Sequence, residues 1–277
     1  MTDALRERLG FLRAGLRGRL RWRDRQDRAR ARAAMEAVVG PGPGIDRLAR
    51  RHLALHEQRE HFVLDQLSSR RADPAGVAVL HELYAQRRGV LLSYCHHGLF
   101  ANIGAPAARI TGEEVLAVAG DWLLKPLDEA PERERRWRAN LERDRVRLIA
   151  TSAAPEELPR LLAAGKVVSN TFDMPGGMRT DFLGRPVMLA SGTARITHEV
   201  GALVMLVARR LRRGRPLVTF GATFDPRDFG RWEDLHAALA RAHTEAILAD
   251  PAALEDPRRQ GAWEQWATAS SWERPPR

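Results

Sequence analysis

The chain has 277 residues, 44% of them hydrophobic, which suffices for one large domain or two small ones with a real core. Its single cysteine, Cys95, excludes an internal disulfide and a cysteine-built zinc site and fits a reducing compartment. No apolar run reaches membrane-spanning length, and the N-terminus is charged where a signal peptide would be apolar. We therefore expect a cytoplasmic protein.

The net charge of +10 is concentrated at the N-terminus. Residues 1–34 contain eleven arginines and four acidic residues, a balance of +7 that leaves +3 for the rest. Residues 3–34 are typical of a basic amphipathic helix, because leucines recur at steps of three or four at positions 5, 9, 12, 16 and 20. Such a helix can bind an anionic membrane surface or pack its leucines on the protein. No nucleic-acid motif accompanies the charge, so we expect no nucleic-acid partner.

A break rich in glycine and proline at residues 40–44 separates this extension, residues 1–40, from a predicted domain over residues 45–272. Helices are predicted over residues 45–70 and 74–88. His52, His56 and His61 lie on the first of them. We interpret these histidines as part of a solvated face, because no acidic residue completes a metal-binding pattern there.

From residue 90 onward, strand-like and helix-like segments alternate. The predicted strands are 90–95, 114–119, 146–150, 167–172, 186–190, 202–208 and 217–224. The predicted helices are 126–143, 155–163, 191–200, 232–249 and 258–272, the last carrying three tryptophans. This alternation predicts a single-domain α/β sandwich, with a mixed, largely parallel central sheet flanked by helices. No Walker or dinucleotide fingerprint is present.

The first predicted strand runs into two histidines and a glycine, His96, His97 and Gly98. If a helix begins near Gly98, this turn lies at the carboxyl end of the sheet, where open α/β folds place their chemistry. His97 could act there as a general base, with the Asn102 amide near its imidazole. The alternative is a structural histidine that caps a helix. Cys95 ends the strand, and we interpret it as a core residue.

Two further stretches are candidates for ligand binding. Asp173 follows the strand at 167–172 and precedes Pro175-Gly176-Gly177, a turn that would bring backbone close to a ligand. A plain turn is the alternative. Ser191-Gly192 begins the next helix, with Ser191 as its expected cap.

Together and in this order, two segments resemble the lysophospholipid acyltransferase superfamily: GVLLSYCHHGLFANIG, and the block from Gly165 to Leu211 that begins GKVVSNTFDMPGG. The nearest branch is that of the bacterial lipid A biosynthesis (lauroyl/myristoyl) and phosphatidylinositol mannoside acyltransferases, over residues 45–270. The resemblance implies transfer of an acyl group from acyl-carrier protein or acyl-CoA to a hydroxyl or amine of a lipid or specialised metabolite. It implies no cofactor and no metal, only the thioester co-substrate.

In that interpretation His97 and Asn102 are the catalytic residues, with His97 as general base. Substrate binding is assigned to Asp173, Gly176, Gly177, Arg179 and Gly192. A peripheral position on the inner face of the cell membrane follows if residues 3–34 bind lipid.

The sequence departs from the family pattern at the acid of the His-x4-acid motif. Asn102 stands there, and it can orient His97 but cannot stabilise an imidazolium by charge. His96 does not restore the motif, because Ala101 stands at its acid position. We expect Asn102→Asp to preserve or raise activity. The alternative function is a non-catalytic protein of the same fold that binds acyl chains or a carrier.

Overall fold

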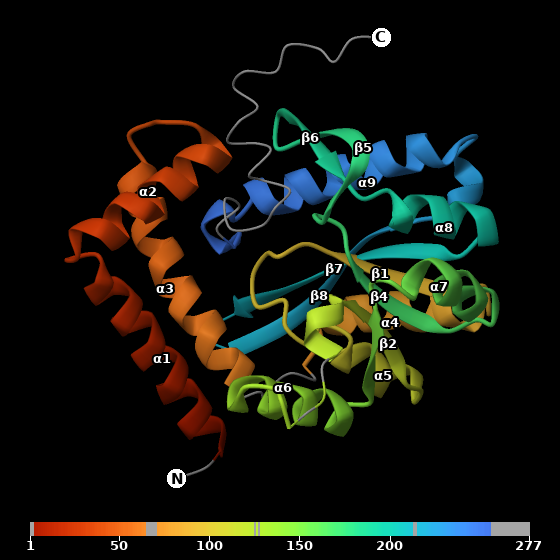
Figure 1. Ribbon diagram of the computed structural model, residues 1–277, viewed down its shortest axis with the longest axis horizontal. Helices are drawn as coiled ribbons and strands as arrows, with labels where there is room; N and C mark the ends of the chain where they lie inside the picture. Colours follow the sequence, from red (N-terminus) through yellow and green to blue (C-terminus); the bar gives the residue numbers. More distant parts are fainter. Residues whose placement is uncertain (1–2, 65–70, 125, 127, 213–214, 256–277) are drawn as a thin grey trace.

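The computed structural model describes residues 3–64, 71–124, 126, 128–212 and 215–255 (Figure 1). A six-stranded sheet lies at its centre, in the strand order β3–β2–β4–β1–β7–β8. The strands are β1 (Val90–Tyr94), β2 (Val115–Ala119), β3 (Val146–Ala150), β4 (Val167–Thr171), β7 (Leu203–Arg212) and β8 (Arg215–Phe224). The first five are parallel, and β8 is antiparallel to β7. The predicted α/β fold with a mixed, largely parallel sheet is confirmed.

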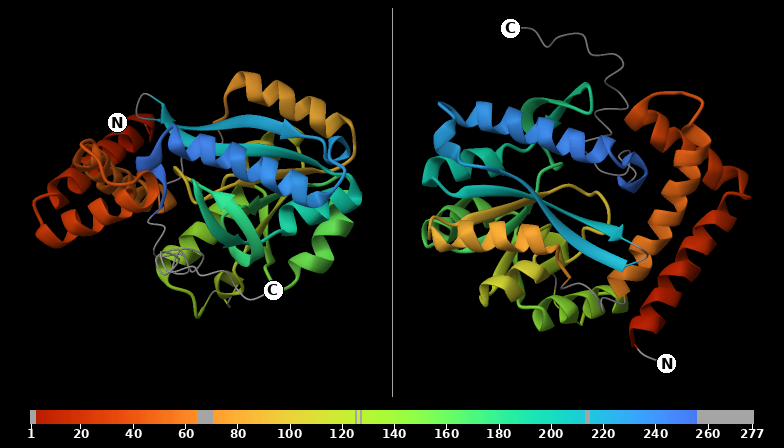
Figure 2. Two further views of the ribbon diagram at one scale, coloured as in Figure 1. Left: turned by 90° about the horizontal axis from the view of Figure 1, so that it is seen from above. Right: turned by 180° about the vertical axis from the view of Figure 1, so that it is seen from behind.

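Helices cover both faces of the sheet (Figures 1 and 2). One face carries α7 (Ala154–Ala163), α8 (Gly192–Val200) and α9 (Trp232–Leu248), and the other carries α4 (Pro74–Ala85) and α5 (Ala105–Thr111). Helix α6 (Glu132–Arg143) packs against β3. Leu91 belongs to the core under α7–α9, whereas Val90 and Leu92 belong to the core under α4 and α5. Because both faces are covered, parallel strands read as continuous apolar runs in the sequence.

Three N-terminal helices lie together at one side of the molecule: α1 (Asp3–Arg21), α2 (Arg25–Val39) and α3 (Ile45–Leu64) (Figures 1 and 2). The prediction of one helix over residues 3–34 is wrong. The first helix ends at Arg21, and Asp24 caps the second, because its side chain accepts a hydrogen bond from the Asp27 N–H at 2.8 Å. Helix α2 buries Met35 in the same core as the sheet, so the extension packs on the predicted domain.

Strands β5 (Pro175–Phe182) and β6 (Arg185–Leu189) form a separate antiparallel hairpin that packs on α9. The prediction of a turn at Pro175-Gly176-Gly177 is therefore wrong, since these residues begin β5 with an irregular register. A Cβ on Gly176 would lie 2.3 Å from the Ala190 Cα atom. This glycine thus permits the close approach of two backbone segments.

Short 3-10 helices complete the fold: η1 (Asp121–Leu124), η2 (Pro226–Asp228) and η3 (Pro251–Ala253). Ser191 occupies the N-cap position of α8, but its side chain does not accept a hydrogen bond from the first turn of that helix. The predicted helix at 258–272 lies outside the described residues. No helix in the described part of the chain is both long and apolar enough to cross a membrane.

The interpretation of the α3 histidines as a solvated face is wrong for His52, which is buried. Its Nδ1 lies 3.2 Å from the carbonyl oxygen of Ala252. The ring therefore anchors α3 to η3. Within the described residues, no group of three or more His, Cys, Asp or Glu side chains is placed to hold a metal ion.

Candidate functional site

The segment between β1 and α5, residues 95–104, is an irregular loop instead of the predicted helix. Gly98 and Asn102 have left-handed backbone conformations, with φ of +73° and +52°. Such residues cannot continue a right-handed helix. The helix begins only at Ala105. Residues 95–104 are here called the β1–α5 loop. Because this loop is not helical, its backbone groups need hydrogen-bond partners from other parts of the chain.

Two buried arginines bind the carbonyl oxygens of the β1–α5 loop. Arg59 of α3 donates from Nε to Gly98 O at 2.9 Å and from Nη2 to Ala253 O at 2.8 Å. Arg209 of β7 donates to the carbonyl oxygens of Leu99, Ala101 and Asn102. Burial lowers the pKa of both guanidinium groups, that of Arg209 to about 9 against the raising effect of Asp144. Strand β7 carries arginines at 209, 210 and 212, and only the tertiary structure shows that Arg209 is the fully buried one.

His96 and Asp173 form a histidine–carboxylate pair at the carboxyl ends of β1 and β4. These strands are parallel neighbours with Tyr94 opposite Thr171, so the residues two positions beyond each lie side by side. Asp173 Oδ1 lies 3.0 Å from His96 Nδ1, and the His96 N–H donates to both carboxylate oxygens, at 3.1 and 2.9 Å. The Asp173 side chain is fully buried, whereas that of His96 is 21% exposed.

The sequence did not reveal this pair, because the motif places the acid in the same segment as the histidine, whereas Asp173 lies 77 positions from His96. The equal offset of both residues from the ends of two predicted strands is the signal that could have found it. Sequence alone did not say that β1 and β4 are neighbours in the sheet.

The contact with Asp173 fixes the tautomer of His96. With Nδ1–H donating to the carboxylate, Nε2 of the neutral ring is the proton-accepting nitrogen. Burial lowers the pKa of His96, but the charge and hydrogen bond of Asp173 outweigh it, so the pKa is raised above its ordinary value. The ring also packs edge-on against Phe100, with centroids 4.8 Å apart. An oriented imidazole of this kind is suited to general-base chemistry.

His97 has different surroundings from its neighbour. Its side chain is buried, and its Nε2 lies 2.9 Å from the carbonyl oxygen of Asp250, to which it donates as a neutral ring. Burial lowers the pKa of His97, and this effect exceeds the opposing one of the Asp250 carbonyl. The histidine is therefore neutral at pH 7 and held by backbone.

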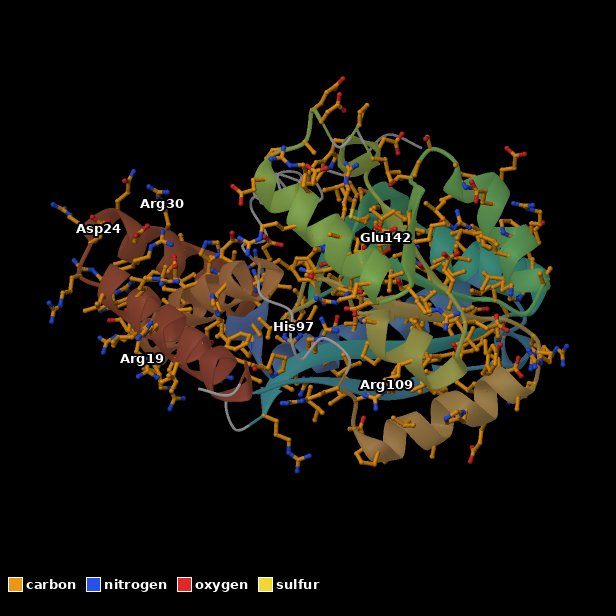
Figure 3. All side chains as sticks on the ribbon, turned by 90° about the horizontal axis from the view of Figure 1, so that it is seen from below. Arg19, Asp24, Arg30, His97, Arg109 and Glu142 are labelled. Atoms are coloured by element: carbon orange, nitrogen blue, oxygen red, sulfur yellow. The ribbon has the colours of Figure 1, made fainter. Side chains whose placement is uncertain are left out.

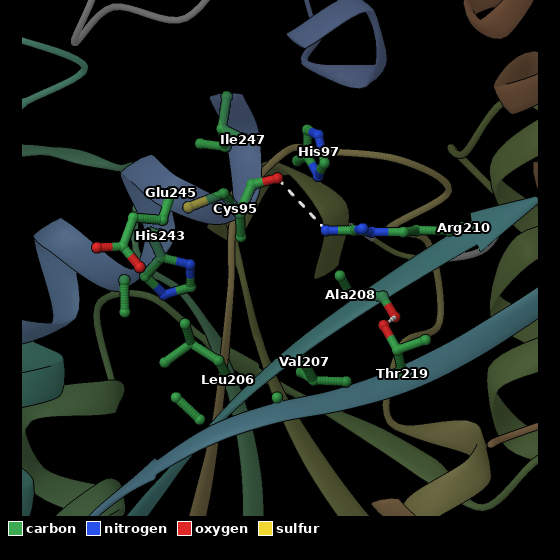
Figure 4. Close-up of a pocket in the computed structure, with 14 residues that line it drawn as sticks. Cys95, His97, Leu206, Val207, Ala208, Arg210, Thr219, His243, Glu245 and Ile247 are labelled. Atoms are coloured by element: carbon green, nitrogen blue, oxygen red, sulfur yellow. Dashed lines mark hydrogen bonds between the residues drawn. The ribbon is translucent and has the colours of Figure 1, made fainter. Parts of the chain in front are cut away.

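His97 also lines a cavity of about 330 Å³ between α9 and strands β7 and β8 (Figure 4). Small and apolar side chains form most of its wall, with Arg210, His243 and Glu245 as the main polar members. Arg210 donates from Nη2 to the Ala246 carbonyl at 3.3 Å. Cys95 lies in the wall as a buried thiol whose pKa is raised well above its ordinary value by burial. This agrees with its interpretation as a core residue.

Asn102 is part of the β1–α5 loop and its supports. Its Nδ2 donates to Asp144 Oδ2 at 2.8 Å, and its carbonyl oxygen accepts from Arg209 Nη2 at 2.8 Å. The amide therefore binds Asp144, whereas we expected it near the His97 ring. Asparagine also tolerates the left-handed conformation that this position requires. These contacts explain Asn102 without a role in proton transfer.

Of the residues predicted to bind substrate, Asp173 joins the histidine pair. Gly176, Gly177 and Arg179 lie on β5, where Arg179 is exposed, and Gly192 is the first residue of α8. A ligand role for these four residues stays a prediction.

Comparison with known proteins does not assign this chain to a family. No protein-family model matches it, and a search of curated proteins finds no match. The resemblance to the lysophospholipid acyltransferase superfamily thus rests on the sequence segments alone.

Proposed function

We propose that this protein is an acyltransferase that moves an acyl group from a thioester donor to a hydroxyl or amine of a lipid or specialised metabolite. The donor is acyl-carrier protein or acyl-CoA. The observation that carries the proposal is the His96–Asp173 pair, a partly exposed imidazole held by a buried carboxylate. We assign the general base to His96 in place of His97, because the Asp173 carboxylate can stabilise an imidazolium on His96, whereas the ring of His97 is bound only to the uncharged carbonyl of Asp250.

The proposed reaction has one attack and one departure. Nε2 of His96 accepts the proton of the acceptor O–H or N–H while that oxygen or nitrogen attacks the thioester carbonyl carbon. The tetrahedral intermediate collapses, the C–S bond breaks, and the leaving thiolate takes the proton from His96. The Asp173 carboxylate stabilises the imidazolium that exists between these two proton transfers. No covalent acyl-enzyme is required.

A second function has its own support in the cavity beside His97. Its volume of about 330 Å³ is at the lower end of the range for small-molecule sites, and most of its wall is apolar. In this alternative the chain binds an acyl group without transferring it. His97 would then be a wall residue.

Thioester release with a panel of acyl-CoA and acyl-carrier donors, with and without candidate acceptors, separates these functions. For transfer, we expect release that depends on the acceptor and falls by about 10²–10⁴-fold in His96→Asn. The matched control, His97→Asn, should keep its activity within about tenfold. If His97→Asn alone abolishes release, the base is His97. Donor binding without release from any donor would favour the non-catalytic function.

The pH profile tests the role of Asp173 apart from its effect on folding. Asp173→Asn removes the charge that raises the pKa of His96, so the acid limb of kcat/KM should move to lower pH. The plateau rate should also fall, by up to about 10⁴-fold, because the neutral amide no longer fixes the tautomer or stabilises the imidazolium. An unchanged acid limb would show that Asp173 only holds the backbone.

A further inference from the structure

Helix α1 presents two unlike faces. Its contact with α3 is made by Phe11 and by small residues, Ala14, Gly15 and Gly18, all buried. A Cβ atom on Gly18 would lie 2.3 Å from the Leu53 carbonyl oxygen, so the two helices approach closely. Leu12, Leu16 and Leu20 therefore do not form the packing face that a docked amphipathic helix would use.

The opposite face of α1 exposes Leu12, Leu16 and Leu20, at 58%, 57% and 48%. Their spacing of four residues places them in one row along the helix. Soluble proteins expose single apolar side chains freely, but a contiguous row of large ones marks an interaction surface.

Arginines flank this row on both sides. At 100° per residue, Arg13 lies on one side of the leucines and Arg19 on the other, and both are exposed (Figure 3 labels Arg19). Arg17 on the same helix pairs with Glu57 at 3.7 Å, whereas no carboxylate of the described residues forms a salt bridge with Arg13 or Arg19. A row of leucines between cationic groups has the chemistry of an interfacial helix.

The groove between α1 and α3 adds to the positive charge. A cavity of about 380 Å³ there is lined by Arg19, Arg47, Arg50, Arg51 and Ala54. Arg51 is paired with Asp250 at 2.8 Å, and Arg50 stacks over the Trp22 ring at 4.9 Å. Guanidinium groups gathered in this way bind phosphate oxygens well.

We infer that this surface, Leu12, Leu16 and Leu20 with Arg13 and Arg19, here called the α1 face, docks on an anionic phospholipid membrane. The leucines enter the boundary between headgroups and acyl chains, and the arginines bind the phosphates beside them. Charge complementarity favours a membrane over a protein groove, because cations on both sides of the apolar row match a plane of phosphates. This inference does not depend on the proposed acyl transfer.

Co-sedimentation of the full chain with vesicles tests the inference. We expect binding to vesicles of equal parts phosphatidylglycerol and phosphatidylcholine, and little binding to phosphatidylcholine alone. The triple variant Leu12→Ser, Leu16→Ser, Leu20→Ser should bind at least about tenfold more weakly. The control variant Val79→Ser, Leu248→Ser removes exposed apolar side chains elsewhere, at 37% and 46% exposure, and should bind like the wild type.

A second pair of variants tests the charges. Arg13→Gln, Arg19→Gln should weaken binding by about fivefold for each arginine removed. Arg160→Gln, Arg241→Gln removes the same charge from exposed positions on α7 and α9 and should have a much smaller effect. Circular dichroism and thermal unfolding establish that all variants are folded.

Three results would overturn the inference. The first is equal vesicle binding by the leucine variant and the wild type. The second is equal losses from both arginine variants, which would indicate a diffuse effect of net charge. The third is a dimer in solution that the leucine variant dissociates while the wild type binds no vesicles, since the α1 face would then join two copies of this chain.

Discussion

Arginine has opposite roles in two regions of this protein. Beside the β1–α5 loop, Arg59 of α3 and Arg209 of β7 are buried and bind carbonyl oxygens of that loop. On the α1 face, Arg13 and Arg19 point to solvent beside exposed leucines. The first pair holds a shape that only the folded chain has, so its loss should cost stability. The second pair contributes to contacts outside the chain, so its loss should leave stability intact.

The largest effect on stability is expected for Arg209→Leu. This change leaves three loop carbonyls and the Asp144 carboxylate without the guanidinium that faces them. The free energy of unfolding should fall by about 3–5 kcal/mol, as measured by urea denaturation. Arg147→Gln removes an arginine that is 50% exposed and paired with Glu114, and should change it by less than about 1 kcal/mol. Equal losses of unfolding free energy in both variants would contradict the role of Arg209 in holding the β1–α5 loop.

Low pH should lower the free energy of unfolding through the buried His243. His243 is buried between Ser93 Oγ, 2.8 Å from its Nε2, and the Phe172 ring, and burial lowers its pKa to about 4. The unfolded chain therefore binds this proton more tightly, and stability is lost as the pH falls from about 6.5 towards 4. The loss from this group is about 3 kcal/mol at most. Unfolding free energies measured between pH 7 and pH 4 should follow this curve, with a smaller slope in His243→Gln.

Asn102→Asp should destabilise the protein, whereas the sequence suggested only that this change preserves or raises activity. It would set a carboxylate where the amide donates to Asp144 Oδ2 at 2.8 Å, in a buried site. The free energy of unfolding should fall by about 2 kcal/mol at neutral pH and recover in acid, when one carboxylate is protonated. The exchanged pair, Asn102→Asp with Asp144→Asn, restores one amide and one acid and should recover part of the loss. Full activity and stability in Asn102→Asp would contradict this assignment.

The smallest effect is expected on the α1 face. Leu12→Ser, Leu16→Ser, Leu20→Ser should change the free energy of unfolding by less than about 0.5 kcal/mol per substitution, because each of the three leucines is about half-exposed. By contrast, Gly18→Leu should separate α1 from α3 and lower the thermal unfolding temperature, since even a Cβ atom there meets backbone. If the serine variant is the less stable one, the leucines are part of the core.

The order and class of the elements could be predicted because local patterns carry them. The apolar run at Val90–Tyr94 and the alternation of later segments predicted the six strands of the central sheet and its mixed character, both confirmed, but not strand β5. The leucine periodicity predicted a helix at the N-terminus, although a break at residues 22–24 divides it in two. Burial of Cys95 followed from its place at the end of a strand.

Only the tertiary structure decided which residues meet. The neighbour relation of β1 and β4 brings Asp173 to His96, while Asp250 takes His97 and Asp144 takes Asn102. These partners lie between 42 and 153 positions apart in the chain. Likewise, the sequence showed the spacing of the leucines in α1. It did not show that α1 packs on α3 through its glycine face, where the two backbones approach closely. Local periodicity fixes which residues share a side of a helix or strand, whereas strand order and helix contact distance fix what that side touches.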